Sequence, residues 1–499
     1  MGSSSSRADK MNDYLLDLKL KNLNQLKIHQ QVDDIRNDLE KIDPEKQKHK
    51  YLTLSCIYGA FLGDSIGSFC EFSQPNKQNK DKIFIMQDSV LFLPGELTDD
   101  SEMAISAAFA YIDGINEDPS RIQDLLYYYF CVWLFSNPKD YGNAVLNALN
   151  SWGGKNIKKI KFNPERVREL NKDSLANGFL MRISTFIVYY YFSHYDIIYK
   201  SINSFNPNND KLSDEILKLY LDILKESTLN VEITHPNVEN CISSAVFTLM
   251  VLTGMIKKDA NLIYLLFKKI ANSQEFINCH NENLKDKVSL IQKSKYLTII
   301  HEIENEEEIS VFNSMGYYIH AFKLSIYYLH KYPEMSKNEN KNLYYEIMCD
   351  ICNYGGDTDT NCAIVGTMVG PLIGYKNFKK EYFDILINFI PERRTQFNSA
   401  FMYKYVEILE EKFIQKKENN NNTKNKDKSN KSNNSKDGKK IKTDKTENKD
   451  LETKKENKGI FSGFLKTNNS KDNKEMDNFN YTTFQILQEF FPNNDNENK

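Results

Sequence analysis

The sequence lacks three features that would point to nucleic acid, a membrane or secretion. The 65 Lys and Arg against 68 Asp and Glu give a net charge of −3, which excludes a global positive field for gripping nucleic acid or anionic lipid. No apolar run reaches the roughly 18 residues that cross a bilayer, because residues 179–192 and 244–256 are broken or too short. No secretory signal precedes the eight scattered cysteines. We therefore expect a soluble, cytoplasmic chain without disulfides, transmembrane segment or nucleic-acid partner.

Large apolar side chains are concentrated in the middle of the chain. Between residues 46 and 415, Ile, Leu, Phe and Tyr recur at spacings of three and four, with few alternating runs. This periodicity predicts an all-α domain. The segment exceeds the usual size of a single domain, and we assign the excess to polar insertions around residues 203–214 and 273–308.

The beginning of the chain is a polar extension. Residues 1–45 contain a heptad-like run of leucines from Leu15 to Leu26, which predicts an accessory helix. The first residues fit the M-G-x-x-x-S pattern for a myristoyl group on Gly2, and a flexible leader fits them equally well. A single myristoyl chain would anchor the protein only weakly and reversibly.

The end of the chain changes composition abruptly. Residues 416–475 are rich in Asn and Lys and bury too little apolar surface to offset their ordering entropy, so they are predicted to be a disordered linker. Residues 476–499 contain a short amphipathic stretch from Phe484 to Phe490. That stretch is either a docking peptide or a helix that folds back on the domain.

Three segments depart from the ordinary helical pattern, and the first is a glycine ridge. Gly59, Gly63 and Gly67 are four residues apart, so they form a bare stripe on one helix face that another backbone can approach closely. The same spacing pairs helices in membranes, but Asp64 and Glu71 make burial in lipid untenable. We therefore expect close helix packing in a soluble core.

The second segment, which starts at Gly95, puts two adjacent carboxylates at the start of a helix. The apolar rows that follow define the helix and place Thr98, Asp99 and Asp100 in its opening turn. A single Asp there would cap the helix and interact favourably with its dipole. Two adjacent Asp exceed that need, so capping and metal binding both remain open for this turn.

The third segment crowds carboxylates at the start of another helix. The pair Gly355–Gly356 breaks the preceding helix, and Asp357, Asp359 and Thr360 then occupy the opening turn of a helix that Pro371 is expected to stop. Crowded carboxylates raise one another's pKa unless a cation neutralises them. Oxygen ligands of this kind suit Mg²⁺ or Mn²⁺ rather than zinc. The two acidic turns can together supply two such ions if the fold brings them together.

These segments carry a family resemblance. The trio GDSIGSFCEF, TDDSEM and GGDTDTNCAIVGTMVG resembles the ADP-ribosylglycohydrolase family, from Leu52 to Tyr375. Shorter matches agree in order: DYGNAV at 140–145, SLANGFLMRIS at 174–184, THPN at 234–237 and SMGYYIHAFKLSIYYL from 314. The resemblance implies a single large orthogonal helical bundle with a binuclear Mg²⁺ or Mn²⁺ centre. The metal ligands here would be Thr98, Asp99, Asp100, Asp357, Asp359 and Thr360.

The resemblance also implies a reaction and a pocket. Members of the family remove ADP-ribose from protein side chains or related conjugates, and the general base would be one of Asp99, Asp100, Asp357 and Glu71. We favour Asp357 as the base and Glu71 as a gate or proton donor. Glu71 resembles the glutamate that the serine-directed branch carries on a mobile flap, which residues 74–82 would form. The diphosphate and ribose pocket would be lined by Gly142, Ser174, Asn177, Gly178 and His235.

Several alternatives remain open. Leu175 and Ala176 stand where the serine-directed branch has a Tyr-Gly pair, so the acceptor is not determined. A non-catalytic ADP-ribose-binding descendant and a metal-dependent phosphoesterase are the rival functions, and retention of all six ligand positions favours the hydrolase. His235 also fits a turn histidine, and Cys349 and Cys352 fit core thiols better than a zinc half-site, since no second pair lies nearby. We expect a monomer acting on an ADP-ribosylated protein or conjugate.

Overall fold

The computed structural model describes residues 25–76, 91–151, 160–338, 341–391 and 394–415. The described part of the chain consists of helices and loops and contains no strand; an isolated bridge joins Ala176 and Tyr317. The predicted all-α class is therefore confirmed. The predictions for Gly2, for residues 416–475 and for residues 476–499 fall outside the described residues.

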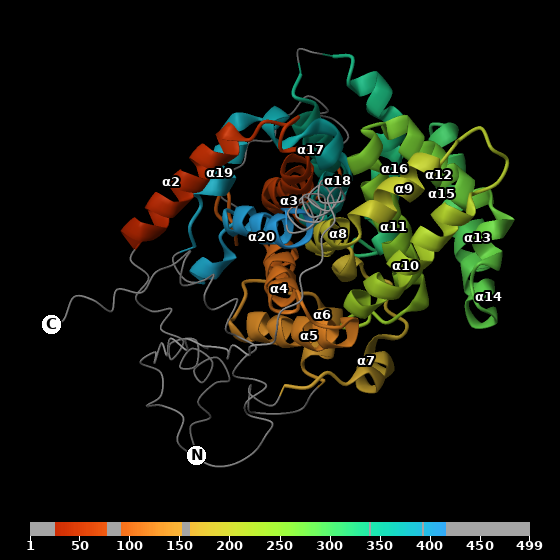
Figure 1. Ribbon diagram of the computed structural model, residues 1–499, viewed down its shortest axis with the longest axis horizontal. Coiled ribbons are helices and arrows are strands. Elements are labelled where there is room, and N and C mark those ends of the chain that lie inside the picture. The colour runs from red at the N-terminus through yellow and green to blue at the C-terminus, as the bar shows by residue number, and fades with distance from the viewer. Residues whose placement is uncertain (1–24, 77–90, 152–159, 339–340, 392–393, 416–499) are drawn as a thin grey trace, which may run out of the picture.

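The helices follow one another in this order: α2 (Gln25–Lys41), α3 (Lys48–Gly67), α4 (Asp99–Asp113), α5 (Pro119–Phe135), α6 (Asn143–Leu149), α7 (Pro164–Asn171), α8 (Ile183–Ser193), α9 (Tyr195–Ser204), α10 (Asp214–Val231), α11 (Val238–Lys257), α12 (Ala260–Asn272), α13 (Gln274–Asn278), α14 (Glu282–Ile291), α15 (Leu297–Glu304), α16 (Tyr318–Met335), α17 (Leu343–Tyr354), α18 (Thr358–Ile373), α19 (Lys380–Asn388) and α20 (Phe401–Glu410). Short 3-10 turns are η2 (Ser68–Cys70), η4 (Asn177–Phe179), η6 (Tyr375–Asn377) and η7 (Thr395–Phe397), and π turns are η5 (Gln292–Tyr296) and η8 (Glu411–Gln415). Figure 1 shows α2 and α19 on one side of α3 and α18, with α10 to α15 on the other.

α3 and α18 lie in the core and touch through their backbones. A Cβ on Gly59 would lie 3.0 Å from Gly370 Cα, and a Cβ on Gly63 would lie 2.6 Å from the Cys362 carbonyl carbon. At Gly67 the nearest atoms also belong to the α18 backbone. Because no side chain fits between the two helices, the predicted glycine ridge is confirmed as a close helix contact.

α18 continues past Pro371 and ends at Ile373, so the prediction that this proline stops the helix is wrong. Proline removes the N–H that would bond the carbonyl four residues back, which belongs to Thr367. The Cys56 thiol of α3 donates to that carbonyl oxygen at 3.8 Å and supplies a substitute partner. The helix ends instead at Gly374, whose φ of +84° leaves the helical region.

The extension before the domain contributes α2, which docks through one apolar face. Ile28, Val32, Ile35 and Leu39 are spaced by three or four residues and are buried. Lys376 donates to two backbone carbonyls at the C-terminal end of α2, where a cation also meets the negative end of the helix dipole. Most of the predicted leucine run lies outside the described residues, and the docking face uses the residues that follow it.

The two predicted insertions have different structures. Residues 203–214 comprise the end of α9, the loop 205–213 and the first residue of α10. Residues 273–308 are mostly helical, in α13, α14, η5 and α15, and bury Phe276, Val288 and Tyr296. The charges of this second segment lie on the outer faces of amphipathic helices, and its assignment as an insertion stays a prediction. Figure 1 places α13 and α14 at one edge of the molecule.

One helix among the described residues, α11, is long and apolar enough to cross a membrane by length and composition alone. Protein covers 89% of its most apolar window. It packs against α10, α12 and α18, so its composition is accounted for by a position inside the helical core.

Candidate metal centre and substrate pocket

The start of α4 is held by α3. Thr98 precedes the helix in an extended conformation, and its hydroxyl accepts the Asp100 N–H. Asp64 of α3 accepts the Thr98 N–H at 3.2 and 3.3 Å and the Ser101 N–H at 3.3 Å. The Asp64 carboxylate therefore acts as a second cap at the positive end of the α4 dipole. These bonds fix the backbone that carries Asp99 and Asp100.

Two glycines shape the turn between α17 and α18. Gly355 and Gly356 have φ values of +67° and +80°, a region that favours glycine. Phe72 N–H donates to the Gly356 carbonyl at 2.7 Å, and Gly356 N–H donates to the Ser73 carbonyl at 3.0 Å. This pairing holds the segment that follows Glu71 against the start of α18.

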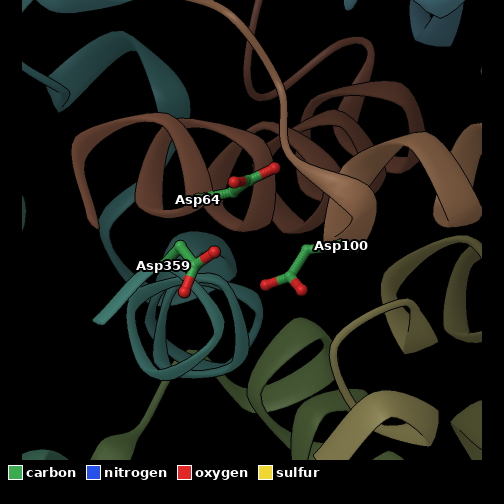
Figure 2. Close-up of side chains that lie close together, drawn as sticks. All are labelled: Asp64, Asp100 and Asp359. Carbon is green, nitrogen blue, oxygen red and sulfur yellow. The ribbon is translucent and has the colours of Figure 1, made fainter. Parts of the chain in front are cut away.

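The two acidic turns meet although they are far apart in the chain. Thr360 Oγ1 donates to Asp100 Oδ1 at 3.1 Å, across a separation of 260 positions. Figure 2 shows the carboxylates of Asp64, Asp100 and Asp359 directed toward a common space from α3, α4 and α18. Oxygens of these three side chains lie within 4.8 Å of one another. Carboxylates from three helices therefore converge on one acidic centre.

A second carboxylate group adjoins the first. Oxygens of Glu71, Asp357 and Asp359 also lie within 4.8 Å of one another, and Asp359 belongs to both groups. Asp99 lies close enough to Asp357 for their charges to interact. The Asp99 pKa lies well above its usual value, mainly because the carboxylate is buried and secondly because the charge of Asp140 repels it. The centre thus offers two neighbouring sets of oxygen donors.

Burial is the largest cause of the pKa shifts in this centre. It raises the pKa of Asp64 to about 7, against the opposing effect of the hydrogen bonds that this side chain accepts. It raises the pKa of Glu71 to about 8, with repulsion from Asp357 as the second cause. The pKa values of Asp100 and Asp359 lie well above the usual range, through burial and repulsion between neighbouring carboxylates.

The acidic residues of the centre could hold a hard divalent cation. Asp100 Oδ2 is buried and has no hydrogen-bond partner among the described residues, which buried carboxylate oxygens seldom tolerate. A cation would supply that partner and neutralise the repulsion among the carboxylates. An oxygen-only donor set suits Mg²⁺ or Mn²⁺. The six ligand positions expected from the sequence all lie in the two turns that build this centre: Thr98, Asp99, Asp100, Asp357, Asp359 and Thr360.

Two acidic residues of the centre carry no role in the sequence-based expectation. In the sequence, Asp64 serves only as an argument against a membrane helix. Its place next to Gly63 in a buried helix is a signal that could have identified it, because a buried carboxylate is costly unless it has a specific role. Asp140 lies near the centre, since its charge raises the pKa values of both Asp99 and Glu71. It belongs to the short DYGNAV match, where nothing singles it out.

Asn177 joins the predicted pocket to the acidic centre. Its Nδ2 donates to Asp357 Oδ2 at 2.6 Å, and its backbone N–H donates to the Gly316 carbonyl at 2.9 Å. Asn240 of α11 donates to the Ser174 carbonyl at 2.9 Å and fixes the beginning of the same segment. The loop before α8 is therefore attached both to α11 and to the start of α18.

The other predicted pocket residues lie beside this loop. A Cβ on Gly178 would lie 2.8 Å from His235 Cε1, so the imidazole edge contacts the Gly178 backbone. The same Cβ would lie 3.6 Å from the Val145 side chain of α6, the helix that Gly142 caps. Gly142 itself borders open space, because a Cβ there would meet nothing within 4 Å. His235 is buried, and burial lowers its pKa to about 3.

Comparison with known proteins identifies the family. Residues 45–417 match the sequence model named ADP-ribosylglycohydrolase. The chain belongs to the ADP-ribosylglycohydrolase family. It is 23% identical over 346 residues to a protein of Acanthamoeba polyphaga mimivirus named "Putative ADP-ribosyl glycohydrolase L543", a match that covers 67% of this chain and 90% of the viral protein. A solved structure titled "ADP-ribosylglycohydrolase-related protein complex" is 16% identical, with a TM-score of 0.45, and covers 72% of this chain and 99% of that chain.

The ADP-ribosylglycohydrolase family assignment covers every element that builds the acidic centre, from α3 to α18. The flap expected at residues 74–82 is described only as far as Asn76, whose N–H donates to the Asn353 carbonyl at 2.8 Å. The rest of that expectation lies outside the described residues.

Proposed function

We propose that this chain is a metal-dependent hydrolase that cleaves the glycosidic bond between ADP-ribose and a protein side chain or related acceptor. The observation that carries the proposal is the hydrogen bond between Thr360 and Asp100, which brings two acidic turns together beside the Asn177 loop. Membership of the family supports glycosidic chemistry, and the name of the viral relative agrees with it.

Two ions of Mg²⁺ or Mn²⁺ would be held by oxygens of the six ligand positions. When bound, the ions would orient the ribose hydroxyls and make a water acidic enough to attack the anomeric carbon. Asp64 would add its charge to the centre while it holds the N–H groups of Thr98 and Ser101. Because α3, α4 and α18 each supply a carboxylate, the position of every ligand depends on helix packing rather than on a single loop.

Asp357 is proposed as the general base. The Asn177 amide donates to Asp357 Oδ2 and so orients the carboxylate that would accept a proton from water. Asp357 is the N-cap residue of α18, and its hydrogen bond with Asn177 joins its carboxylate to the loop that carries the proposed pocket.

Glu71 is proposed as the proton donor to the departing acceptor. It is half-buried at the outer side of the second carboxylate group, directly before Phe72, whose side chain is 58% exposed. The acceptor would leave through this side, since here the buried centre meets solvent. A carboxyl group in this position can protonate the leaving atom as the glycosidic bond breaks.

The ADP-ribose end of the substrate is assigned to the loop before α8. Gly142, Ser174, Asn177, Gly178 and His235 would meet the diphosphate and ribose. Leu175 and Ala176 are half-buried in that loop, where their apolar side chains offer no hydrogen bond to a ligand. We therefore assign recognition of ADP-ribose to backbone groups, Asn177 and His235.

The test is release of free ADP-ribose. The full chain with Mg²⁺ or Mn²⁺ is incubated with an ADP-ribosyl-serine peptide, an ADP-ribosyl-arginine peptide and O-acetyl-ADP-ribose. We expect turnover of at least one conjugate, its loss in chelator, and a rate at least ~100-fold lower in Asp359→Asn. Asp286→Asn, an exposed change on α14, is the matched control and should keep full activity.

Two results would contradict the proposal. Full hydrolysis by Asp359→Asn in chelator would exclude the metal scheme. Tight binding of ADP-ribose by the metal-loaded wild type without cleavage of any conjugate would show a binding protein instead of an enzyme.

A further inference from the structure

Arg182 is fully buried at the N-cap of α8 and forms no ion pair with a carboxylate of the described residues. Its guanidinium donates to neutral oxygens: Gly178 O at 2.6 Å, Thr234 Oγ1 at 2.8 Å, Asn230 O at 3.2 Å and Asn230 Oδ1 at 3.3 Å. Burying a cation without an anionic partner is costly. The acceptors lie on the two segments that carry Gly178 and His235, so the cation ties the two sides of the proposed pocket together.

One of these bonds determines the position of a proton. Thr234 Oγ1 contacts two nitrogens, Arg182 Nη2 and His235 Nδ1, each at 2.8 Å. A guanidinium donates and cannot accept, so Nδ1 is the acceptor available to the Thr234 hydroxyl proton. If Nδ1 carried a proton instead, the hydroxyl oxygen would receive two bonds and its own proton would be left unpaired. Thr234 is fully buried, where such an unpaired donor is avoided.

We infer that Arg182 and Thr234 are positioning residues that fix His235 as a neutral imidazole with its proton on Nε2. A Cβ on Gly178 would lie 3.2 Å from this Nε2, which places the nitrogen beside the pocket loop. His235 thus offers a donor and meets an acceptor oxygen of ADP-ribose, from a phosphate or a ribose hydroxyl. The identity of that ligand rests on the proposed function, whereas the tautomer does not.

The charge of Arg182 also favours the neutral form of the His235 imidazole. Burial is the main reason why the His235 pKa is lowered, and the nearby guanidinium lowers it further. A protonated imidazole would also need an acceptor for a proton on Nδ1, and Thr234 already receives the Arg182 bond on that side. The ring is therefore neutral throughout the neutral pH range.

The first test is ¹⁵N NMR of the full chain labelled at its eight histidines, which needs no substrate. His235→Gln identifies the His235 signals by their disappearance. We expect a protonated Nε2, an unprotonated Nδ1 and no titration near neutral pH. Thr234→Val should give a mixture of tautomers, whereas Thr234→Ser should keep the single form. Arg182→Lys should also give a mixture, because an ammonium group cannot replace the planar guanidinium that bonds Thr234 and the neighbouring oxygens. A proton on Nδ1 in the wild type, or one unchanged tautomer in both Thr234→Val and Arg182→Lys, would overturn the inference.

The second test is calorimetric binding of ADP-ribose in Mg²⁺. We expect Thr234→Val to weaken binding about tenfold and Thr234→Ser to bind within about twofold of wild type, as loss and retention of one oriented hydrogen bond predict. The control is Thr253→Val, which removes a buried hydroxyl that bonds only its own helix. Equal losses in Thr234→Val and Thr253→Val would overturn the positioning role. No binding by the wild type would refute the proposed function, and the NMR result would still decide the tautomer.

Discussion

Gly63→Ala tests whether the backbone contact between α3 and α18 holds the metal centre in place. A Cβ on Gly63 would lie 2.6 Å from the Cys362 carbonyl carbon, whereas ordinary contacts begin at 3.4 Å. The two helices would have to separate by at least about 0.8 Å, because the Cys362 carbonyl oxygen lies closer still and these backbone atoms cannot rotate away. Asp64 follows the substituted residue, and Asp359 lies one turn before Cys362, so the displacement acts directly on two carboxylates of the centre.

The energetic cost follows from this geometry. Overpacking against rigid atoms costs about 3 kcal/mol, and alanine recovers about 1 kcal/mol of helix propensity. Because a domain of this size has an unfolding entropy of about 0.8 kcal/mol/K, the net loss of roughly 2 kcal/mol should lower the melting temperature by about 2.5 °C. Separating Asp64 from Asp359 should also weaken metal binding by about 10- to 100-fold, as changes around metal ligands commonly do.

The assay compares thermal unfolding in chelator with titration calorimetry of Mg²⁺ and Mn²⁺. Gly142→Ala is the matched control for stability, since a Cβ there meets no atom within 4 Å and the backbone φ is −71°. It should change stability by less than about 0.5 kcal/mol. If Gly63→Ala kept the wild-type melting temperature and metal affinity, the helix contact would not determine the geometry of the centre.

Three further predictions concern the carboxylates. In chelator, the native state keeps Asp64 protonated up to about pH 7 whereas the unfolded state releases that proton near pH 4, so the free energy of unfolding should fall across this window, by about 4 kcal/mol for Asp64 alone. Urea titrations at a series of pH values check this, and saturating Mg²⁺ should flatten the slope. Glu71→Gln should lower kcat at least ~100-fold while calorimetry shows little change in metal affinity; unchanged kcat would exclude Glu71 as the proton donor. Asn177→Asp should lower activity more than Asn177→Ala, because it replaces the donor to Asp357 with a second negative charge, and equal rates would contradict that contact.

The features predicted from the sequence are those with a local physical signature. Thr98 and Asp100 stand at the start of a clear helical period, and Gly355–Gly356 break one helix before another begins. Both turns can therefore be recognised from the sequence alone. The glycine ridge around Gly63 is visible for the same reason, because spacing four defines a helix face. Helix class and the acidic turns therefore follow from patterns within a few residues.

The features that the sequence does not predict depend on contacts between residues distant in the chain. Nothing near Asp64 shows that it accepts N–H groups from the start of α4, which only the packed fold reveals. The charge of residues 273–308 predicts an insertion but not its structure, and the helices that bury Val288 and Tyr296 become evident only in the packed fold. Pro371 fails as a helix stop because a thiol on α3 takes the place of the missing N–H.

α3 contacts both of the other helices that build the site. Its glycine face fixes the distance to α18, and the next residue, Asp64, fixes the first turn of α4. The hydrogen bond from Thr360 to Asp100 then joins α18 to α4 directly, which closes a triangle of three helices around the carboxylates. The distance between each pair of these helices is determined by a backbone contact or by a hydrogen bond that involves a backbone N–H or a carboxylate. A substitution on any side should therefore disturb metal affinity before it disturbs the neighbouring pocket, whose Gly178 and His235 are positioned by separate contacts.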